Sequence, residues 1–408
     1  MFRLNKKRIY LDFASITPID RKVQKVLTQS HRFFANPSAL YKEGVVAKKQ
    51  LENARQEIAR TLRAHKDEVV FTSGGTEGNN LAILGAYKEA EKKLEHNLHM
   101  VVSSIEHSSV LECVKYLETE EGVEVTYIHP NEEGIVSPRE IGEALRDNTF
   151  LVSVHLVNNE IGVIEPIQEI AKTIRHFKKE QTKQGSQTSL VYPLLHTDAC
   201  QAFNYLSIDT TKLAVDLMTF DGTKIYGPRG SGVLYIRRGV SMAPVIFGGG
   251  QEAGLRSGTE NLPSIVALAE AFMLCEKTRT AETARLAKLQ TYFFEKLKKE
   301  IPEAKLNGSL NARVVHNINF CIKGIDAEFT VFQFDAAGIA ISSASSCLSK
   351  KEDSYSYVVK RIKPTESCEG ASLRVSLGRM TTKADIDQFF RVYKLKIKNR
   401  EYRTKDII

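Results

Sequence analysis

Residues 68–90 read EVVFTSGGTEGNNLAILGAYKEA, in which a short apolar run, a glycine-containing turn and a helical pattern follow one another directly. A strand that passes straight into a helix is the repeating unit of α/β proteins. Such a turn leaves backbone N–H groups free at the positive end of the helix dipole, where they can bind a phosphate. An ordinary strand–helix turn is the alternative interpretation. Gly75 and Thr76 are therefore candidate phosphate-binding residues.

Similar apolar runs recur along the chain. Each ends in a polar cluster, and most are followed by a helical segment, which predicts α/β architecture with one mainly parallel, seven-stranded sheet. The runs are EVVFTS (68–73), HMVVSS (99–104), VEVTYI (123–128), FLVSVHLV (150–157), LVYPLLHT (190–197), VDLMTF (215–220) and GVLYIRR (232–238).

The domain boundary is inferred from a change in this pattern. The periodic segment PSIVALAEAFMLCEKT (263–278) predicts a helix that leaves the sheet, and shorter, more separated elements follow it. We predict a large domain at 19–262 and a smaller α+β domain formed by 1–18 and 263–408. A chain of 408 residues with 42% hydrophobic content is long enough for both.

Composition argues against several classes of protein. The net charge is +8, but the basic residues are interleaved with acidic ones, as in AEKKLEH (90–96), so nucleic-acid binding is not expected. No apolar run approaches the ~18 residues of a membrane span. The N-terminal residues contain no apolar signal core, so export is not expected either.

Cysteine usage predicts a reducing compartment. The chain has six cysteines, scattered without the CxxC spacing of zinc or redox sites. We therefore expect a cytoplasmic protein without a structural metal, in which most of these thiols are buried packing residues.

In open α/β sheets, ligands bind beyond the carboxyl ends of the strands, so the polar residues that follow each run are candidates for a site. They are Thr76, His107, Asn159, Asp198, Gln201 and Lys224. A lysine between two strands lies either at a surface turn or in Schiff-base chemistry, because burying its charge is costly. Asp198 can be a helix cap or can keep the ring nitrogen of a pyridine cofactor protonated.

The ordered series of motifs resembles the cysteine desulfurases, which are enzymes of PLP-dependent transferase fold type I that use pyridoxal 5′-phosphate (PLP). The resemblance runs from about Tyr10 to about Phe390. It rests on YLDFASITP, FTSGGTEGNNLAI, EHSSVLE, VNNEIGVI, HTDACQ, DGTKIYGPRG, GGGQEAGLRSGTEN, SSASSC and SLRVSLGRMTT. It implies conversion of L-cysteine to L-alanine, with transfer of the sulfur to acceptor proteins such as an iron–sulfur scaffold.

The resemblance also implies a role for each cofactor residue. Lys224 is expected to bond covalently to PLP, and His107 to stack on its ring. Asp198 is expected to pair with the pyridine nitrogen, and Gln201 with the ring oxygen.

Further residues are assigned to the substrate, the sulfur and the neighbouring subunit. Asn159 and Arg374 resemble the clamp for the substrate carboxylate, and arginine suits a bidentate pair. Cys347 resembles the thiol that accepts sulfur as a persulfide, in a segment whose composition predicts a mobile loop. Thr259 resembles the residue that reaches the phosphate of the neighbouring subunit's cofactor, which implies a homodimer.

The chain departs from the family pattern next to the catalytic lysine. Asp221 and Thr223 stand where the family usually has serine and histidine, both of which donate hydrogen bonds to the phosphate. A carboxylate about 4 Å from a phosphate costs on the order of 4 kcal/mol per unit charge at an effective dielectric near 20. We therefore expect weaker PLP binding unless Asp221 turns away, is protonated or is offset by a cation such as Arg229.

Two alternatives to a desulfurase stay open. One is a catalytically weakened relative that serves as a scaffold subunit, which only Asp221 and Thr223 favour. The other is a different fold type I reaction, either aminotransfer or selenocysteine cleavage. Cys347 speaks against aminotransfer, which needs no carrier thiol, whereas selenocysteine differs from cysteine in one atom only.

Overall fold

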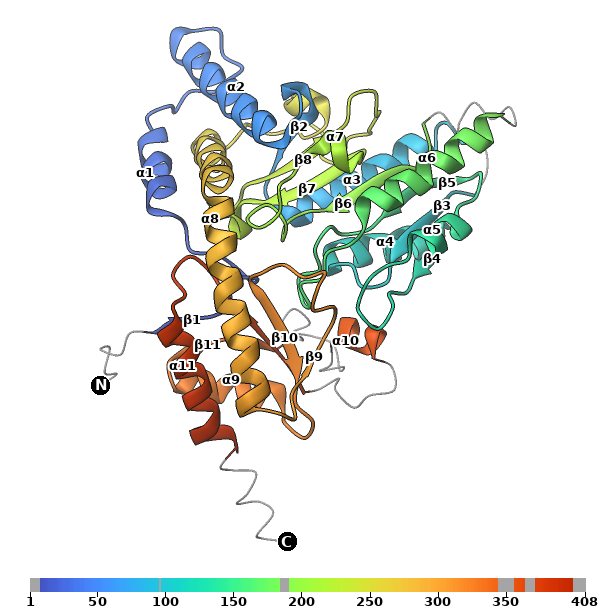
Figure 1. The fold of residues 1–408 in the computed structure, drawn as a ribbon. Coiled ribbons are helices and arrows are strands. Elements are labelled where there is room, and N and C mark those ends of the chain that lie inside the picture. The colour runs from blue at the N-terminus through green and yellow to red at the C-terminus, as the bar shows by residue number, and fades with distance from the viewer. Residues whose placement is uncertain (1–7, 95–96, 184–190, 344–355, 364–370, 399–408) are drawn as a thin grey trace.

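A computed structural model gives the fold of residues 8–94, 97–183, 191–343, 356–363 and 371–398 (Figure 1). The main sheet has seven strands in the order β2-β8-β7-β6-β5-β3-β4. β8 runs antiparallel to both its neighbours and the other pairings are parallel, so the predicted mainly parallel sheet is confirmed. The strands are β2 (Val69–Thr72), β3 (His99–Ser103), β4 (Glu124–Ile128), β5 (Thr149–Ser153), β6 (Leu194–Asp198), β7 (Leu217–Asp221) and β8 (Gly232–Ile236).

Helices cover both faces of this sheet because successive side chains of a strand point to opposite faces. On one face, Met100, Val102 and Leu151 pack with α3 and α4. On the other, Val101 and Val152 pack in a larger core that includes α6 and α8. The helices of this part are α1 (Arg21–Ser30), α2 (Lys42–Leu62), α3 (Gly75–Ala90), α4 (Ser108–Glu120), α5 (Pro138–Ala144), α6 (Ile167–Lys183) and α7 (Thr210–Leu213).

Helix α8 (Leu262–Glu300) connects the sheet with the remaining elements (Figure 1). Asn261 caps its N-terminus by accepting a hydrogen bond from Ser264 N, and Pro263 lies in the first turn, where no backbone donor is needed. Its 39 residues extend well beyond the predicted segment 263–278. Residues on its first half pack against α1 and α2, and Phe293 near its end packs against Phe389 and Phe390.

Two small sheets lie at the far end of α8. β1 (Ile9–Tyr10) pairs in parallel with β11 (Ile339–Ala340), which joins the N-terminal segment to the part of the chain that follows α8. A four-stranded sheet has the order β12-β13-β10-β9. The remaining elements are β9 (Lys305–Leu306), β10 (Asn317–Cys321), α9 (Ala327–Ala336), β12 (Ser342–Ser343), α10 (Tyr357–Ile362), β13 (Ser372–Ser376), α11 (Lys383–Val392) and the π-helix η6 (Tyr393–Lys398). The division into domains at residues 18/19 and 262/263 stays a prediction.

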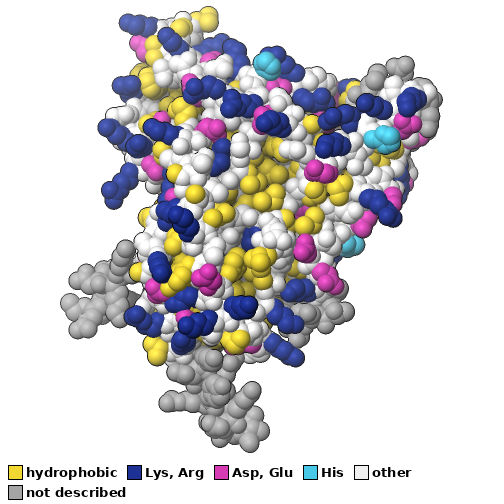
Figure 2. All heavy atoms as spheres, viewed as in Figure 1, with side chains coloured by type: hydrophobic (Ala, Val, Ile, Leu, Met, Phe, Trp, Pro, Cys, Tyr) yellow, Lys and Arg dark blue, Asp and Glu magenta, His cyan; other side chains and the backbone are white. Residues whose placement is uncertain are grey.

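The charged surface agrees with the interleaving seen in the sequence. Figure 2 shows Lys and Arg spread over the visible face, with Asp and Glu between them, and hydrophobic side chains gathered near its middle. In the part of the chain that the structure covers, no helix is both long and apolar enough to cross a membrane.

Candidate active site

A cavity of about 210 Å³ opens at the carboxyl ends of the parallel strands. It brings together nine of the predicted site residues, which are Gly75, Thr76, His107, Asn159, Asp198, Gln201, Asp221, Lys224 and Arg374. They come from segments as far apart as residues 75 and 374, and the sheet edge and β13 place them around one space. Each role assigned to them stays a prediction.

Lys224 enters the cavity from the short 3-10 helix η3 (Gly222–Lys224), which directly follows β7. Its Nζ donates a hydrogen bond to the backbone carbonyl of Ser15. Ser15 also lines the cavity, although it lies in the N-terminal segment. Among the described residues, no ion pair involves Lys224, so its amine is held by a neutral acceptor and is available to a carbonyl compound.

Asp198 is the last residue of β6 and is 7% exposed. Its carboxylate accepts hydrogen bonds from Cys200 N (2.9 Å) and from Asn79 Nδ2 (2.7 Å). Burial alone would raise the pKa of Asp198, but these hydrogen bonds and the neighbouring His107 hold that pKa below its usual value. Asp198 is therefore a buried anion, and within the described ranges no lysine or arginine forms an ion pair with it.

His107 and Gln201 line the same cavity as Asp198. His107 caps α4, and its Nδ1 accepts a hydrogen bond from Ser109 N (3.1 Å). Burial lowers the pKa of His107, so the ring is neutral near pH 7. Gln201 Nε2 donates to Ala14 O (2.8 Å), which again ties the N-terminal segment to the cavity.

Arg374 lies on β13 and is 4% exposed. Its guanidinium donates to Asp12 Oδ1 (3.0 Å), Ser15 Oγ (2.7 Å) and Asn159 O (3.0 Å). Its buried Nε has no hydrogen-bond partner among the described residues. Arg374 therefore presents a fixed cation at the cavity.

Asp221 occupies part of the turn between β2 and α3. Gly75 N donates to Asp221 Oδ2 (3.0 Å), while Thr223 N (2.7 Å) and Thr223 Oγ1 (2.6 Å) donate to Asp221 Oδ1. Gly74 has φ +155°, and a Cβ on Gly75 would lie 2.8 Å from Cys200 Sγ, so both positions require glycine. Gly75 N and the Thr223 hydroxyl, two donors expected at a phosphate, thus already bind a carboxylate.

A buried charged group at the back of the cavity was not predicted. His155 lines the cavity, and its Nδ1 lies 2.6 Å from Glu106 Oε1, with Glu165 on its other side. Burial would lower the pKa of His155, but these two carboxylates raise it to about 9. A histidine inside the apolar run FLVSVHLV was the signal in the sequence.

Three predicted residues lie elsewhere or cannot be placed. Thr223 adjoins the cavity, but its hydroxyl donates to Asp221. Thr259 is exposed and does not line this cavity. Cys347, with the mobile loop predicted around it, lies outside the described residues.

Comparison with known proteins identifies the family. The chain matches the Aminotransferase class-V family over residues 9–389. It is 37% identical to "Cysteine desulfurase IscS" of Dictyoglomus turgidum, covering 94% of this chain and 92% of that protein. It is 38% identical to the protein of the same name from Methanosarcina thermophila, covering 95% and 91%. The chain belongs to the cysteine desulfurase family.

Solved structures of similar proteins show the same fold. A structure described as a NifS-like protein has a TM-score of 0.85 at 28% identity and covers 95% of this chain and 99% of its own. "SspA in complex with cysteine" has a TM-score of 0.74 at 34% identity and covers 91% and 99%. The chain therefore shares its fold with these solved structures.

The side chains of the cavity fit the cofactor of this family at the ring. Asp198 is a buried anion that lacks an ion-paired cation among the described side chains, as a partner for a protonated ring nitrogen must. Lys224 supplies the amine, and His107 the flat neutral ring. The phosphate end fits less well, because the carboxylate of Asp221 takes part of the turn.

Proposed function

We propose that this chain is a PLP-dependent cysteine desulfurase that converts L-cysteine to L-alanine and transfers the sulfur to Cys347. The observation that carries the proposal is the convergence of Lys224, Asp198 and Arg374 on one cavity. Lys224 is an amine that can bond to PLP, and Asp198 is a buried anion that can pair with its ring nitrogen. Arg374 is a fixed cation that can bind the carboxylate of the substrate. A protein of this fold and family, SspA, has a structure in complex with cysteine.

PLP, when bound, supplies an electron sink for negative charge at the Cα of the substrate. Lys224 would hold it, Asp198 would keep its ring nitrogen protonated, and Gln201 and His107 would contact its ring. Lys224 would then serve as the base that moves the Cα proton, because it lines this cavity. Arg374, with Asn159, would orient the substrate by its carboxylate.

The sulfur step balances between the substrate and one thiol. The Cys347 thiolate attacks the substrate sulfur, so that an S–S bond forms and the substrate C–S bond breaks. The electron pair of that bond remains on the substrate carbon, which takes up a proton. L-cysteine and the Cys347 thiol thus become L-alanine and a Cys347 persulfide, which requires no external oxidant or reductant.

Chain length supports the assignment of Cys347. Ser343 is the last described residue before it, and β12 pairs with β13 so that Ser342 faces Arg374. Cys347 follows Ser343 by four residues. In sequence it is therefore close to β12, which pairs with the strand that carries Arg374 of the proposed carboxylate clamp.

The wider setting of the reaction is part of the proposal. Exposed apolar side chains between α1 and α2 and on a distant loop, including Phe34 (81% exposed), Leu40 (96%) and Phe247 (74%), favour a homodimer. Exposed Thr259 would then face the partner's cofactor. We further propose that the persulfide is passed to protein acceptors, such as an iron–sulfur scaffold, in the cytoplasm, where a thiolate carrier is kept reduced.

Mass spectrometry of the protein after one turnover tests this proposal. We expect a mass increase of one sulfur atom on the peptide that contains Cys347 when PLP-loaded protein meets one equivalent of L-cysteine. Cys347→Ser should remove the increase without preventing cofactor binding. A sulfur atom on another cysteine, or on none, would refute the assignment. The same experiment with L-selenocysteine distinguishes a desulfurase from a selenocysteine lyase.

Arg374→Lys should raise the KM for L-cysteine about tenfold or more. Lysine keeps the charge but cannot form a bidentate pair with a carboxylate, and a loss of ~1.4 kcal/mol corresponds to tenfold. Steady-state alanine formation measures the effect. Arg379→Lys is the matched control, because Arg379 also pairs with an aspartate (Asp20, 3.0 Å) but does not line the cavity. An unchanged KM in Arg374→Lys would remove Arg374 from the clamp.

Ser356→Ala should slow persulfide formation about fivefold while leaving the KM for L-cysteine unchanged. Ser356 is the first described residue after Cys347, caps α10, and donates to Glu160 Oε2 (2.6 Å), the residue that follows the cavity residue Asn159 in the chain. Losing such a cap costs about 1 kcal/mol, which corresponds to roughly fivefold. Ser356→Thr keeps the hydroxyl and should restore the rate. Equal single-turnover rates in the parent protein, Ser356→Ala and Ser356→Thr would show that the hydrogen bond between Ser356 and Glu160 has no effect on persulfide formation.

A further inference from the structure

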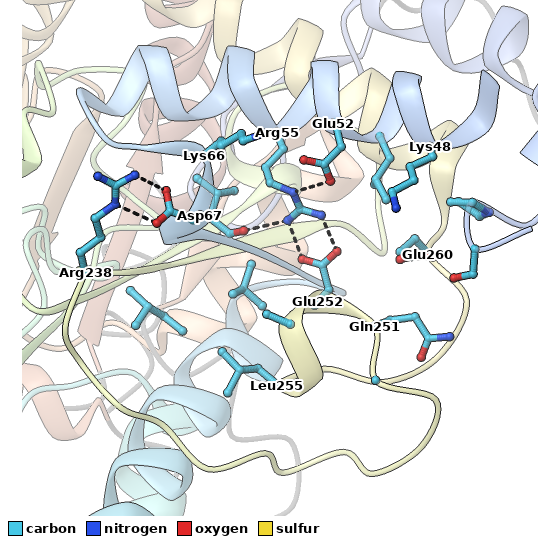
Figure 3. A pocket seen from close by; sticks show the side chains of 18 of the residues that line it. Lys48, Glu52, Arg55, Lys66, Asp67, Arg238, Gln251, Glu252, Leu255 and Glu260 are labelled. Carbon is cyan, nitrogen blue, oxygen red and sulfur yellow. Dashed lines mark hydrogen bonds and ion pairs between the residues drawn. The ribbon is translucent and has the colours of Figure 1, made fainter. Parts of the chain in front are cut away.

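A second cavity, of about 580 Å³, lies between α2, strand β2 and the loop at 250–260 (Figure 3). The loop contains the short 3-10 helix η4 (Glu252–Gly254). Glu252 (φ 49°) and Ala253 (φ 55°) are consecutive non-glycine residues in the left-handed region. Such a conformation persists only where the surroundings hold it in place, and it often marks a functional segment.

The carboxylate of Glu252 is what holds this turn. Its side chain is 2% exposed and accepts three hydrogen bonds, from Arg55 Nη1 (2.7 Å), Arg55 Nη2 (2.8 Å) and Phe71 N (2.8 Å). Arg55 Nη1 also donates to Val69 O (2.8 Å), and the guanidinium lies over the Phe71 ring, 4.6 Å from its centroid. Figure 3 shows Arg55 reaching down from α2 between Glu52 and Glu252.

These contacts lie at the edge of β2 that faces away from β8. Among the described strands, β2 is at the edge of the sheet and pairs with β8 alone, so its other edge has backbone groups without a strand partner. Two of these groups, Phe71 N–H and Val69 C=O, are satisfied by Glu252 and Arg55. The pair therefore fixes β2 from the side on which no strand lies.

A second ion pair from the same loop reaches the turn that follows β2. Arg256 Nε donates to Glu77 Oε1 (2.8 Å), and Glu77 Oε2 accepts a hydrogen bond from Ser73 N (3.0 Å). Glu77 lies in the first turn of α3. The loop thus holds the chain at Phe71, just before the turn 73–76, and at Glu77, just after it.

We propose that Arg55 and Glu252 are positioning residues, which together with Arg256–Glu77 hold the turn 73–76 in the geometry that binds the cofactor phosphate. The turn carries Gly75 and Thr76, whose orientation depends on where β2 ends. Neither Arg55 nor Glu252 lines the active-site cavity, so they act through β2. The inference rests on the proposed function in that the phosphate of PLP is taken as the ligand of this turn.

The test compares two ion pairs of one cavity. Arg238 and Asp67 form a bidentate pair (2.7 and 2.6 Å) at the other side of the pocket (Figure 3). Both side chains are about half exposed, and among the described residues neither side chain forms a hydrogen bond with β2. Glu252→Ala, Glu252→Gln and Arg55→Lys are therefore compared with Asp67→Asn. Amide hydrogen exchange of the peptide spanning 71–76 is measured without cofactor, and the Kd for PLP by absorbance titration.

We expect Glu252→Ala to speed exchange across 71–76 and to raise the Kd for PLP, each at least tenfold, while Asp67→Asn stays within twofold of the parent protein. Glu252→Gln keeps the shape of the side chain but removes its charge, and Arg55→Lys keeps the charge but cannot form the bidentate pair, so both should shift the two quantities in the same direction. If Glu252→Ala does not fold, Glu252→Gln and Arg55→Lys test the inference in its place. Exchange and Kd within twofold of the parent in folded Glu252 and Arg55 variants would overturn the inference. Failure of the parent protein to bind PLP would instead refute the proposed function, and the exchange data would still decide whether the pair holds the turn.

Discussion

Lys224→Ala should abolish alanine formation from L-cysteine, with a fall in kcat of at least about 10³-fold. Two losses combine in this variant, because Lys224 is both the covalent attachment point for PLP and the base at Cα. A positioned general base alone contributes about 10²- to 10⁴-fold. The rate is measured with excess PLP, so that weaker cofactor retention does not account for the loss. The visible band of lysine-bound cofactor should disappear as well.

Two further variants show that this loss is chemical. Lys224→Arg keeps a cation at the end of η3 but cannot lose a proton near neutral pH, so it should be as inactive as the alanine variant. Lys212→Ala removes an exposed lysine at the end of α7 and should keep full activity. Alanine formation by Lys224→Ala within tenfold of the parent rate would place the catalytic amine elsewhere.

Asp221→Ser should tighten PLP binding by between about tenfold and 10³-fold. A carboxylate near a phosphate costs on the order of 4 kcal/mol at an effective dielectric near 20, and partial screening reduces this. Asp221 also accepts a hydrogen bond from Gly75 N, a donor of the phosphate-binding turn (3.0 Å). Serine removes the charge and releases this donor. The Kd is measured by absorbance titration of protein stripped of cofactor.

The chain offers a matched control for this substitution. Asp209 caps α7 and accepts hydrogen bonds from Thr211 N (3.1 Å) and Thr211 Oγ1 (2.6 Å), the same arrangement that Asp221 makes with Thr223. Asp209→Ser loses a similar cap far from the cavity and should leave the Kd for PLP unchanged. A Kd that is equal in Asp221→Ser and the parent protein would show that Asp221 does not compete with the phosphate.

Much of the fold follows from the apolar runs. All seven runs form strands of one sheet because their length and bounding turns suit a buried strand. The bounds were less accurate. Within the described part of LVYPLLHT, the strand begins at Leu194, since Pro193 has no N–H to donate to a neighbouring strand. The helix predicted at 263–278 continues to Glu300 because its later turns pack against the smaller sheets.

The site residues that come directly after predicted strands could be predicted from the sequence. The contacts between segments far apart in the chain could not. Asp198 and His107 stand directly after apolar runs, so the sheet edge predicted their meeting. Ser15 and Asp12 reach Lys224 and Arg374 across more than 200 and 360 residues of sequence, a contact that no local pattern encodes. The contact of Glu252 with β2 is likewise long-range.

Asp221 was predictable from the sequence as a charge but not in its contacts. Its carboxylate predicted repulsion of a phosphate, unless the side chain turns away, is protonated or pairs with Arg229. In the described part of the chain no ion pair joins Asp221 and Arg229. The carboxylate instead binds Gly75 N and Thr223, inside the turn. The sequence shows the charge but not the donors within its reach.

The most direct test of the account is to add L-cysteine and a reductant to the PLP-loaded protein and to measure alanine and sulfide together. The account predicts that both appear in equal amounts over several turnovers, and that both are lost in Lys224→Ala and in Cys347→Ser. PLP-loaded protein that holds its cofactor but forms neither product from L-cysteine would contradict the assignment as a cysteine desulfurase.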